Sequence, residues 1–337
     1  MERSTHESRK RTPWDGKEMN PTQQFLYDHY SKHYQERHPS LSEAGEAEMV
    51  NSYTPKACPF CRSAHFKKDG YDGNGIRRFQ CISCRKKFKP TTGTIFDSRR
   101  IPVSEWMEYC LNIFHYVSLN ADSWNNRNAF TTAKYWLKKL FLTLEHYQDD
   151  IMLGGTVWLD ETYYSVLMRD REHNADGQLL RGLSRNQICV GVATDKKQVI
   201  CVVEGYGKPS QKKSLDAFRS HIVPGSTLIH DKESTHRKLI QVLSLNSVEH
   251  LSAETKNLPD KSNPLEPVNH IHFLLKRFLN AHSGFNRDEL SGYLNLFAYV
   301  MNPPEERLEK VEKIVRMGFE NPKLLRYREA MGANRDI

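Results

Sequence analysis

Four of the seven cysteines stand in two pairs whose spacing is typical of a metal site. Cys58-Pro-Phe-Cys61 and Cys81-Ile-Ser-Cys84 are separated by 19 residues, within the range of two C-x2-C pairs that bind one tetrahedral Zn2+ ion. Each pair would present two thiolates to the same ion. Two disulfides would use the same residues, but an intracellular chain disfavours them. The spacing therefore predicts a structural zinc site made by Cys58, Cys61, Cys81 and Cys84.

Two apolar runs farther along the chain each end in an aspartate. Thr156-Val-Trp-Leu-Asp160 and Ser226-Thr-Leu-Ile-His-Asp231 have the composition of short strands. Carboxylates that meet at neighbouring strand ends can bind hard cations such as Mg2+, which prefer oxygen ligands. Taken alone, however, each acid is more simply an ordinary strand-end carboxylate. The elements around the two residues therefore decide between these interpretations.

The residues around the cysteines predict a small hairpin. Asp72-Gly73-Asn74-Gly75 supplies a turn, and Arg77-Arg78-Phe79-Gln80 supplies the returning strand. Aromatic side chains that can cover the metal are Phe66, Tyr71, Phe79 and Phe88. Because so short a segment buries little apolar surface, we expect zinc binding to supply its folding free energy.

The elements around the aspartates predict a mixed α/β sheet. Strands at 188–193 and 199–203 follow the first run, and a helix over 210–221 precedes the second. A short helix, a strand near Val248 and a helix that begins at Pro267 come next, with further helices after them. Three strands, a helix and a fourth strand are the order of a ribonuclease-H-like sheet, in which the first and fourth strands are neighbours. Asp160 and Asp231 are therefore expected to meet.

Between these two regions the pattern is helical. One apolar period starts at Pro102 and Ser104, and a second, capped by Thr131-Thr132, runs to Leu144, with a polar break over 118–128. Lysines lie off the second stripe: Lys134, Lys138 and Lys139. The pattern predicts a helix-turn-helix-like unit whose basic face could enter a DNA groove. A plain packing linker fits the same pattern.

The charge is concentrated in one segment. The 337 residues carry a formal charge of +8, yet residues 51–100 hold 12 Lys and Arg against three Asp. This block alone has a net charge of +9, and the rest of the chain nearly cancels. A basic block on a near-neutral body is typical of polyanion binding, most often of nucleic acid. The alternative is a solvated basic face without a partner.

Composition excludes several classes of protein. With 38% apolar and 10% aromatic residues, the chain is unlike a disordered protein. The longest aliphatic stretches are far shorter than the roughly 20 residues of a membrane-spanning helix, and the amino terminus has no apolar segment of a secretory signal. We therefore expect a soluble, cytoplasmic protein. The three single cysteines are expected to be inert core thiols: Cys110, Cys189 and Cys201.

Taken in order, these motifs resemble those of bacterial insertion-sequence transposases of the fifteen-ninety-five family, whose catalytic domain is related to that of eukaryotic Merlin elements. The cysteine pairs are followed by Thr91-Thr-Gly-Thr-Ile-Phe96, and the first acidic strand reads Trp158-Leu-Asp-Glu-Thr-Tyr163. Arg181-Gly-Leu-Ser-Arg185 comes before the second strand, and Pro267-Val-Asn-His-Ile-His-Phe-Leu-Leu-Lys-Arg277 supplies the last motif. The resemblance covers about residues 55–305.

The resemblance implies a DNA transposase that binds terminal inverted repeats and then cleaves and joins DNA ends. Phosphodiester attack needs an activated nucleophile and a stabilised leaving oxygen, and two cations about 3.5–4 Å apart supply both. Asp160 and Asp231 would hold two Mg2+ or Mn2+ ions, with Asp160 as the bridging ligand. Two DNA ends and a target must be brought together, so a homodimer or higher assembly on double-stranded DNA of the nucleoid is expected.

The third ligand of the family pattern is an acid or Asn seven residues before a Lys, and here Asn269 precedes Lys276. An amide offers an oxygen but no charge, so such a site would hold its second metal more weakly. Glu266, 35 residues after Asp231, remains the alternative third ligand. Lys276 would bind a DNA phosphate, or is a solvated helix lysine. His236 and His272 are expected to be structural residues or DNA contacts and not metal ligands.

The basic residues expected to bind DNA lie in three places. They are Arg77, Arg78, Arg85, Lys86 and Lys87 in the ribbon, Lys134 and Lys138 in the helical unit, and Lys276. Two other functions fit the same motifs. One is a domesticated or degenerate DNA-binding protein that no longer cleaves, which the neutral Asn269 suggests, and the other is a hydrolytic nuclease without strand transfer.

We accordingly expect five regions. They are a partly helical lead-in (1–50, with helices around 22–34), a zinc ribbon (51–97), a helical DNA-binding unit (98–150), a ribonuclease-H-like catalytic domain (151–305) and a helical tail (306–337).

Overall fold

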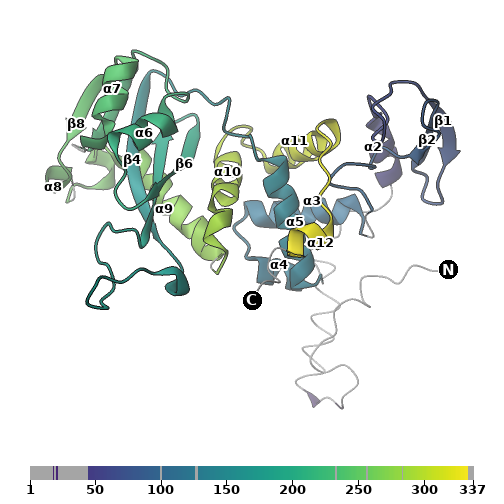
Figure 1. Cartoon of the computed structure of the whole chain (residues 1–337), viewed down its shortest axis with the longest axis horizontal. Coiled ribbons are helices and arrows are strands. Elements are labelled where there is room, and N and C mark those ends of the chain that lie inside the picture. Colours follow the sequence, from purple (N-terminus) through teal and green to yellow (C-terminus); the bar gives the residue numbers. More distant parts are fainter. Residues whose placement is uncertain are drawn as a thin grey trace. The chain divides into compact units, whose positions relative to one another are not determined.

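The computed structural model describes residues 18, 20–21, 45–98, 101–125, 128–231, 234–255, 257–282 and 284–332. The helices expected around residues 22–34 lie outside this description. The chain divides into two compact units, Met1–Thr143 with Arg307–Ile337, and Leu144–Glu306 (Figure 1). None of the described helices is both long enough and apolar enough to cross a membrane.

The first unit contains the predicted hairpin. Its three antiparallel strands are β1 (Phe66–Tyr71), β2 (Arg77–Cys81) and β3 (Lys87–Phe88), in the order β1-β2-β3. The turn forms because the Asp72 carboxylate accepts hydrogen bonds from the amides of Asn74 (2.8 Å) and Ile76 (2.9 Å). Gly75 has a φ of +75°, which a residue without a side chain adopts readily.

Six helices complete the described part of this unit. They are α2 (Glu46–Ser52), α3 (Val103–Phe114), α4 (Leu119–Asn125), α5 (Phe130–Thr143), α11 (Arg307–Glu320) and α12 (Tyr327–Gly332). The polar segment over 118–128 is mostly helical, because α4 occupies Leu119–Asn125. Side-chain hydrogen bonds support this helix: Ser118 caps the amide of Ala121 (3.1 Å), and Asn112 donates to Asp122 (2.9 Å).

Helix α11 packs against residues at both ends of the ribbon segment (51–97). The ring of Phe319 stacks on Tyr53 with centroids 4.2 Å apart, and it also lies against Phe96 at 4.8 Å. At Gly318 a Cβ atom would come within 2.9 Å of Ile95. Helix α11 therefore contributes to the core of the first unit.

The second unit is built on a five-stranded sheet. Its strands are β4 (Thr156–Ser165), β5 (Gln187–Thr194), β6 (Val199–Tyr206), β7 (Thr227–Asp231) and β8 (Asn246–His250), in the order β6-β5-β4-β7-β8. β4, β5 and β6 are antiparallel neighbours, whereas β7 and β8 run parallel to β4. This is the predicted ribonuclease-H-like mixed sheet. The first strand is longer than expected, since β4 continues past Asp160 to Ser165.

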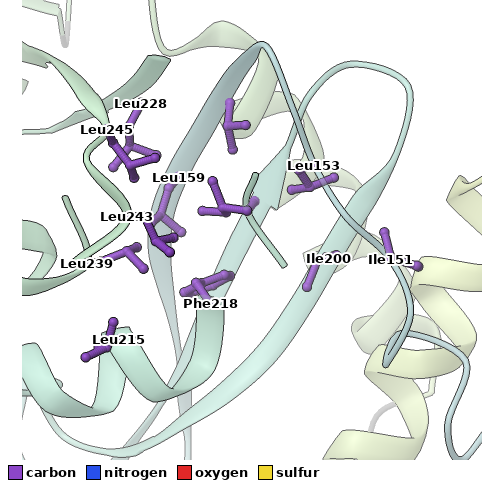
Figure 2. Close-up of a cluster of buried hydrophobic side chains, with 13 residues drawn as sticks. Ile151, Leu153, Leu159, Ile200, Leu215, Phe218, Leu228, Leu239, Leu243 and Leu245 are labelled. Atoms are coloured by element: carbon purple, nitrogen blue, oxygen red, sulfur yellow. The ribbon is translucent and has the colours of Figure 1, made fainter. Parts of the chain in front are cut away.

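Helices cover both faces of this sheet. They are α6 (Gln211–Phe218), α7 (Arg237–Leu243), α8 (Ser252–Thr255), α9 (Glu266–Ala281) and α10 (Leu290–Met301). Side chains alternate along a strand, so Val157 and Leu159 of β4 enter the core formed with α6 and α7, shown in Figure 2. Trp158, on the other face, donates its indole N–H to the carbonyl of Pro264 (2.9 Å), just before α9. Asp160 points to the α9 face for the same reason.

A bulge in β6 places a carboxylate inside the core. Cys189 pairs with Gly205 and the next residue, Val190, with Val203, so Glu204 is the extra residue. Its side chain is buried over Gly191, where a Cβ atom would lie 2.3 Å from the Glu204 carboxylate. Burial, followed by the nearby charge of Glu161, raises the pKa of Glu204 to about 8.

We predict that Gly191→Ala destabilises the second unit. The new methyl group would lie 2.7 Å from ring carbons of the fully buried Phe218, and overpacking of this kind costs about 1–3 kcal/mol. Urea unfolding should show the loss, whereas Gly154→Ala, whose methyl group would meet Val223 at 3.4 Å, should change stability by less than about 1 kcal/mol. Equal effects of the two substitutions would contradict this account of the core.

Candidate metal centres

The four paired cysteines converge on one point of the ribbon. The Sγ atoms of Cys58 and Cys84 are 3.7 Å apart, those of Cys61 and Cys81 are 3.5 Å apart, and all four lie within 4.8 Å of one another. Disulfide sulfurs are about 2.05 Å apart, whereas four thiolates about 2.3 Å from one tetrahedral ion lie about 3.8 Å from each other. The cluster therefore has the geometry of a metal site, and the thiols are free.

The two cysteine pairs adopt the same backbone conformation. The residue after each second cysteine is left-handed, Arg62 with φ +60° and Arg85 with φ +62°. The amide of each of these arginines donates back to the first cysteine's carbonyl, at 2.9 Å to Cys58 and 3.1 Å to Cys81. This fold-back aims both sulfurs of a pair at the same point. The amide of Cys84, 3.4 Å from the Cys81 sulfur, is the main cause that lowers the pKa of Cys81 to about 6, which favours the metal-binding thiolate.

The basic residues predicted to bind DNA differ in their exposure and in their contacts with other side chains. In the second cysteine pair's loop, Arg85 and Lys86 are exposed, and Lys86 lies over the ring of Phe60 (4.9 Å). Lys87 is exposed but forms an ion pair with Asp69 at 2.9 Å.

The β2 arginines are half-buried. The guanidinium of Arg77 lies 4.4 Å from the ring centre of Tyr71 and donates to its hydroxyl. Arg78, its neighbour, is half-buried as well. Both arginines are therefore partly held by the ribbon itself.

The basic face expected on α5 is smaller than the sequence indicates. Lys138 donates to the carbonyl of Ala330 (2.8 Å), and Lys139 is buried with its ammonium 4.5 Å from the ring centre of Tyr135. Lys134 is half-buried. Long lysine stems can cover apolar surface, which the helical period alone does not reveal.

The second centre lies where β7 ends beside β4. Their parallel register stops at Leu159 opposite His230, and the next residue of each strand is an acid. One carboxylate oxygen from each of Asp160, Glu161 and Asp231 lies within 4.8 Å of the others. The strand order thus brings the two predicted aspartates together and adds Glu161 to them.

Burial and the neighbouring acids together disfavour the charged form of Asp160. Burial, then the charges of Asp231 and Glu161, raises the pKa of Asp160 from 3.8 to about 7. A divalent cation among these oxygens would remove this penalty, and carboxylates are the ligands that Mg2+ and Mn2+ prefer. The donor set therefore fits a hard cation.

Glu161 is held from the opposite face of the sheet. Although burial raises its pKa, a hydrogen bond from His236 Nε2 (3.0 Å) and one from the Thr235 hydroxyl (3.3 Å) lower it. The other His236 nitrogen lies 3.2 Å from His230 Nδ1, and His230 Nε2 lies 2.9 Å from the hydroxyl of Ser247. These partners assign a protonated His236 that donates to Glu161 and to a neutral His230. Despite the cost of burial, Glu161 raises the pKa of His236.

The sequence gives no role to Glu161 or His230, and it predicts His236 only as a structural residue or a DNA contact. The available signal was an Asp-Glu pair in the first strand and a histidine five residues after Asp231. The spacing along the sequence does not predict that the side chains of Glu161 and His236 meet, because the sequence does not reveal how the chain runs between them.

Helix α9 approaches Asp160 with a different residue from the one predicted. Asn269 and Lys276 are exposed and Glu266 is half-buried, whereas His272 is buried with Nδ1 3.7 Å from the Asp160 carboxylate. Residues 269, 272 and 276 are three and four apart and share one side of the helix. Asn269 and Lys276, the residues predicted from the sequence, therefore lie on the same side of α9 as His272. The residue that contacts Asp160, however, is His272.

Residues 152–302 match a family model described as "ISXO2-like transposase domain". No curated protein matches the sequence. A chain in the structure of the simian T-cell lymphotropic virus intasome with PP2A regulatory subunit B56 gamma is 13% identical, over 56% of this chain and 66% of its own, with a TM-score of 0.26. Two structures of Mos1 transposase complexes also match. The mariner paired-end complex with Mn is 11% identical over 65% and 79% (TM-score 0.26), and that with the left transposon end is 13% identical over 64% and 79% (0.23). TM-scores this low support no conclusion about the fold or function of this chain.

We predict that Asp160→Asn stabilises the protein in buffer free of divalent cations. The folded pKa of about 7 lies above the ordinary 3.8, so stability is fully present below about pH 4 and is lost as pH rises through 7. At pH 8 the substitution should raise the free energy of unfolding by about 2 kcal/mol, and at pH 4 it should have little effect.

Calorimetric melting curves at the two pH values measure this difference. Mg2+ or Mn2+ should raise the wild-type Tm at pH 8 more than that of the variant, and Asp216→Asn, at an exposed position on α6, is the matched control. A lower Tm for Asp160→Asn at pH 8 would show that the carboxylates do not repel each other as described.

Proposed function

Because residues 152–302 belong to the ISXO2-like transposase family, we propose that this protein is a DNA transposase that binds the terminal inverted repeats of an insertion sequence and catalyses cleavage and strand transfer. The observation that carries the proposal is the group of three carboxylates, Asp160, Glu161 and Asp231, within 4.8 Å at adjoining strands of that domain. Its substrate is double-stranded DNA of the nucleoid, and two ends require at least a dimer.

Each residue of the site is assigned a separate role in the reaction. Asp160 lies beside Asp231 on one side and His272 of α9 on the other, so Asp160 would be the ligand shared by a pair of Mg2+ or Mn2+ ions. When bound, two such ions activate the attacking hydroxyl or water and stabilise the leaving oxygen. Asn269, or Glu266 in its place, completes the set from α9. Lys276, exposed on the same stripe as Asn269, positions a DNA phosphate.

The Glu161–His236 pair lowers the net negative charge of the site. A protonated His236, buried 3.0 Å from Glu161, neutralises that acid from behind the sheet. Asp160 and Asp231 then supply the negative charge that the cations require.

DNA binding is assigned to the basic ribbon and the helical unit. Arg85 and Lys86 are exposed in the ribbon and can neutralise phosphates directly. Arg77, Arg78 and Lys87 contribute to the positive field around them, as does Lys134 on α5. Lys138 would have to leave the carbonyl of Ala330 to reach DNA, so we assign it the smallest share.

We predict that purified protein joins labelled element ends to a target plasmid in Mg2+ or Mn2+, and that Asp160→Ala and Asp231→Ala abolish joining. Loss of a metal ligand removes several kcal/mol of transition-state stabilisation, so the rate should fall about a thousandfold or more. Asp216→Ala, which changes an exposed acid of α6, should leave the rate unchanged. The variants Glu266→Gln and Asn269→Ala are measured in parallel. The variant that loses more activity identifies the third ligand.

The outcomes also separate the alternatives. Joined product that persists in both aspartate variants would disprove the mechanism. Cleavage without joining would indicate a hydrolytic nuclease, and binding of the ends without either product would indicate a domesticated DNA-binding protein.

We predict that the purified chain contains one Zn2+ and that Cys61→Ser loses it together with DNA binding. The ribbon core consists of little more than Phe66, Phe79 and Phe88 around the cysteines, so metal binding must supply its folding free energy. Atomic absorption and a gel-shift assay measure the two losses. Ser83→Ala, inside the second cysteine pair's loop, should keep both. Full DNA binding by a zinc-free Cys61→Ser protein would contradict the assignment.

A further inference from the structure

We propose that His272 is a ligand of the catalytic cation at Asp160, so that this site combines an imidazole nitrogen with carboxylate oxygens. The inference deepens the proposed function and rests on it, because it requires a cation at Asp160. It also changes the expected metal, since nitrogen donors favour first-row transition ions such as Mn2+ over Mg2+.

The distance between the two side chains suits a shared ion. His272 Nδ1 and Asp160 Oδ2 are 3.7 Å apart, which is too long for a hydrogen bond or a charge-assisted pair. Two donor atoms that each lie about 2.1–2.2 Å from one ion are about 3.0–3.8 Å apart at ordinary coordination angles. A cation between the imidazole and the carboxylate therefore fits with little movement of either group.

The burial of His272 makes an uncompensated ring costly. Only 8% of the residue is exposed, and its Nε2 has no hydrogen-bond partner among the residues described. A buried polar group without a partner costs free energy. The nitrogen that faces Asp160 is the other one, Nδ1, and it is the atom that a cation at Asp160 would meet.

The position of His272 on α9 places it on the correct side of Asp160. Asp231 reaches Asp160 along the sheet, from the adjoining end of β7, whereas His272 reaches it from the helix. Asp160 thus lies between two other possible metal ligands, the carboxylate of Asp231 and the imidazole of His272. A carboxylate that bridges two ions would need this position. Asn269 and Lys276 share the helix stripe of His272, so a phosphate held by Lys276 would approach the same ion.

Electron spin echo spectroscopy of Mn2+ tests the proposal directly, because a coordinated imidazole gives nitrogen modulation that a water or carboxylate ligand does not. The full chain, zinc-loaded and without a histidine tag, is titrated with Mn2+ in the absence of DNA. We expect nitrogen modulation in the wild type, its loss in His272→Gln, and a weakening of Mn2+ affinity by about tenfold to a hundredfold. His270→Gln, which changes the exposed histidine two residues earlier, should keep both properties.

The competing outcomes are distinct. Bound Mn2+ without nitrogen modulation, or modulation that survives His272→Gln and disappears in His236→Gln, would overturn the inference while leaving the transposase proposal intact. Absence of Mn2+ binding in the wild type would overturn both. Circular dichroism confirms folding, and His272→Asn provides a second variant if His272→Gln does not fold. The ratio of Mn2+ to Mg2+ affinity should fall in whichever variant folds.

Discussion

Like charges gathered in a partly buried site repel each other, and the second unit is organised around that repulsion. The register of β4 and β7 forces Asp160 and Asp231 together at the point where β7 ends, and Glu161 comes with them. Burial, and then the charges of Asp231 and Glu161, raise the pKa of Asp160. The surrounding elements either compensate this charge or leave it for cations to neutralise.

Compensation is unequal on the two faces of the sheet. Behind the sheet, His236 pairs with Glu161 and is supported in turn by His230. On the α9 face Asp160 meets a buried histidine at a distance that gives no hydrogen bond. One face is therefore paired within the protein, whereas on the other face His272 does not pair with the Asp160 carboxylate at hydrogen-bonding distance. Groups that lower stability in this way are common at functional sites.

Much of the architecture could be predicted because it depends on local patterns. The cysteine spacing fixes a tetrahedral site, since two short loops joined by a hairpin can place four sulfurs around one point. The order of strands and helices predicts which strands are neighbours, and hence that Asp160 and Asp231 meet. Helix α4 has no clear apolar period in the sequence, so its bounds could not be predicted; in the structure its Asp122 accepts a hydrogen bond from Asn112.

The sequence by itself determined the residues that can do chemistry and the order of the elements that carry them. Only the tertiary structure decided which side chains touch. The rotation of α9 about its axis presents His272 to Asp160 while Asn269 and Lys276 stay exposed, and helical spacing leaves that rotation open within one stripe. The contact of Glu161 with His236, and of Lys138 with Ala330, likewise depends on how distant segments pack. Spacing along a chain constrains residues within one element, whereas contacts between elements follow from packing of the whole core.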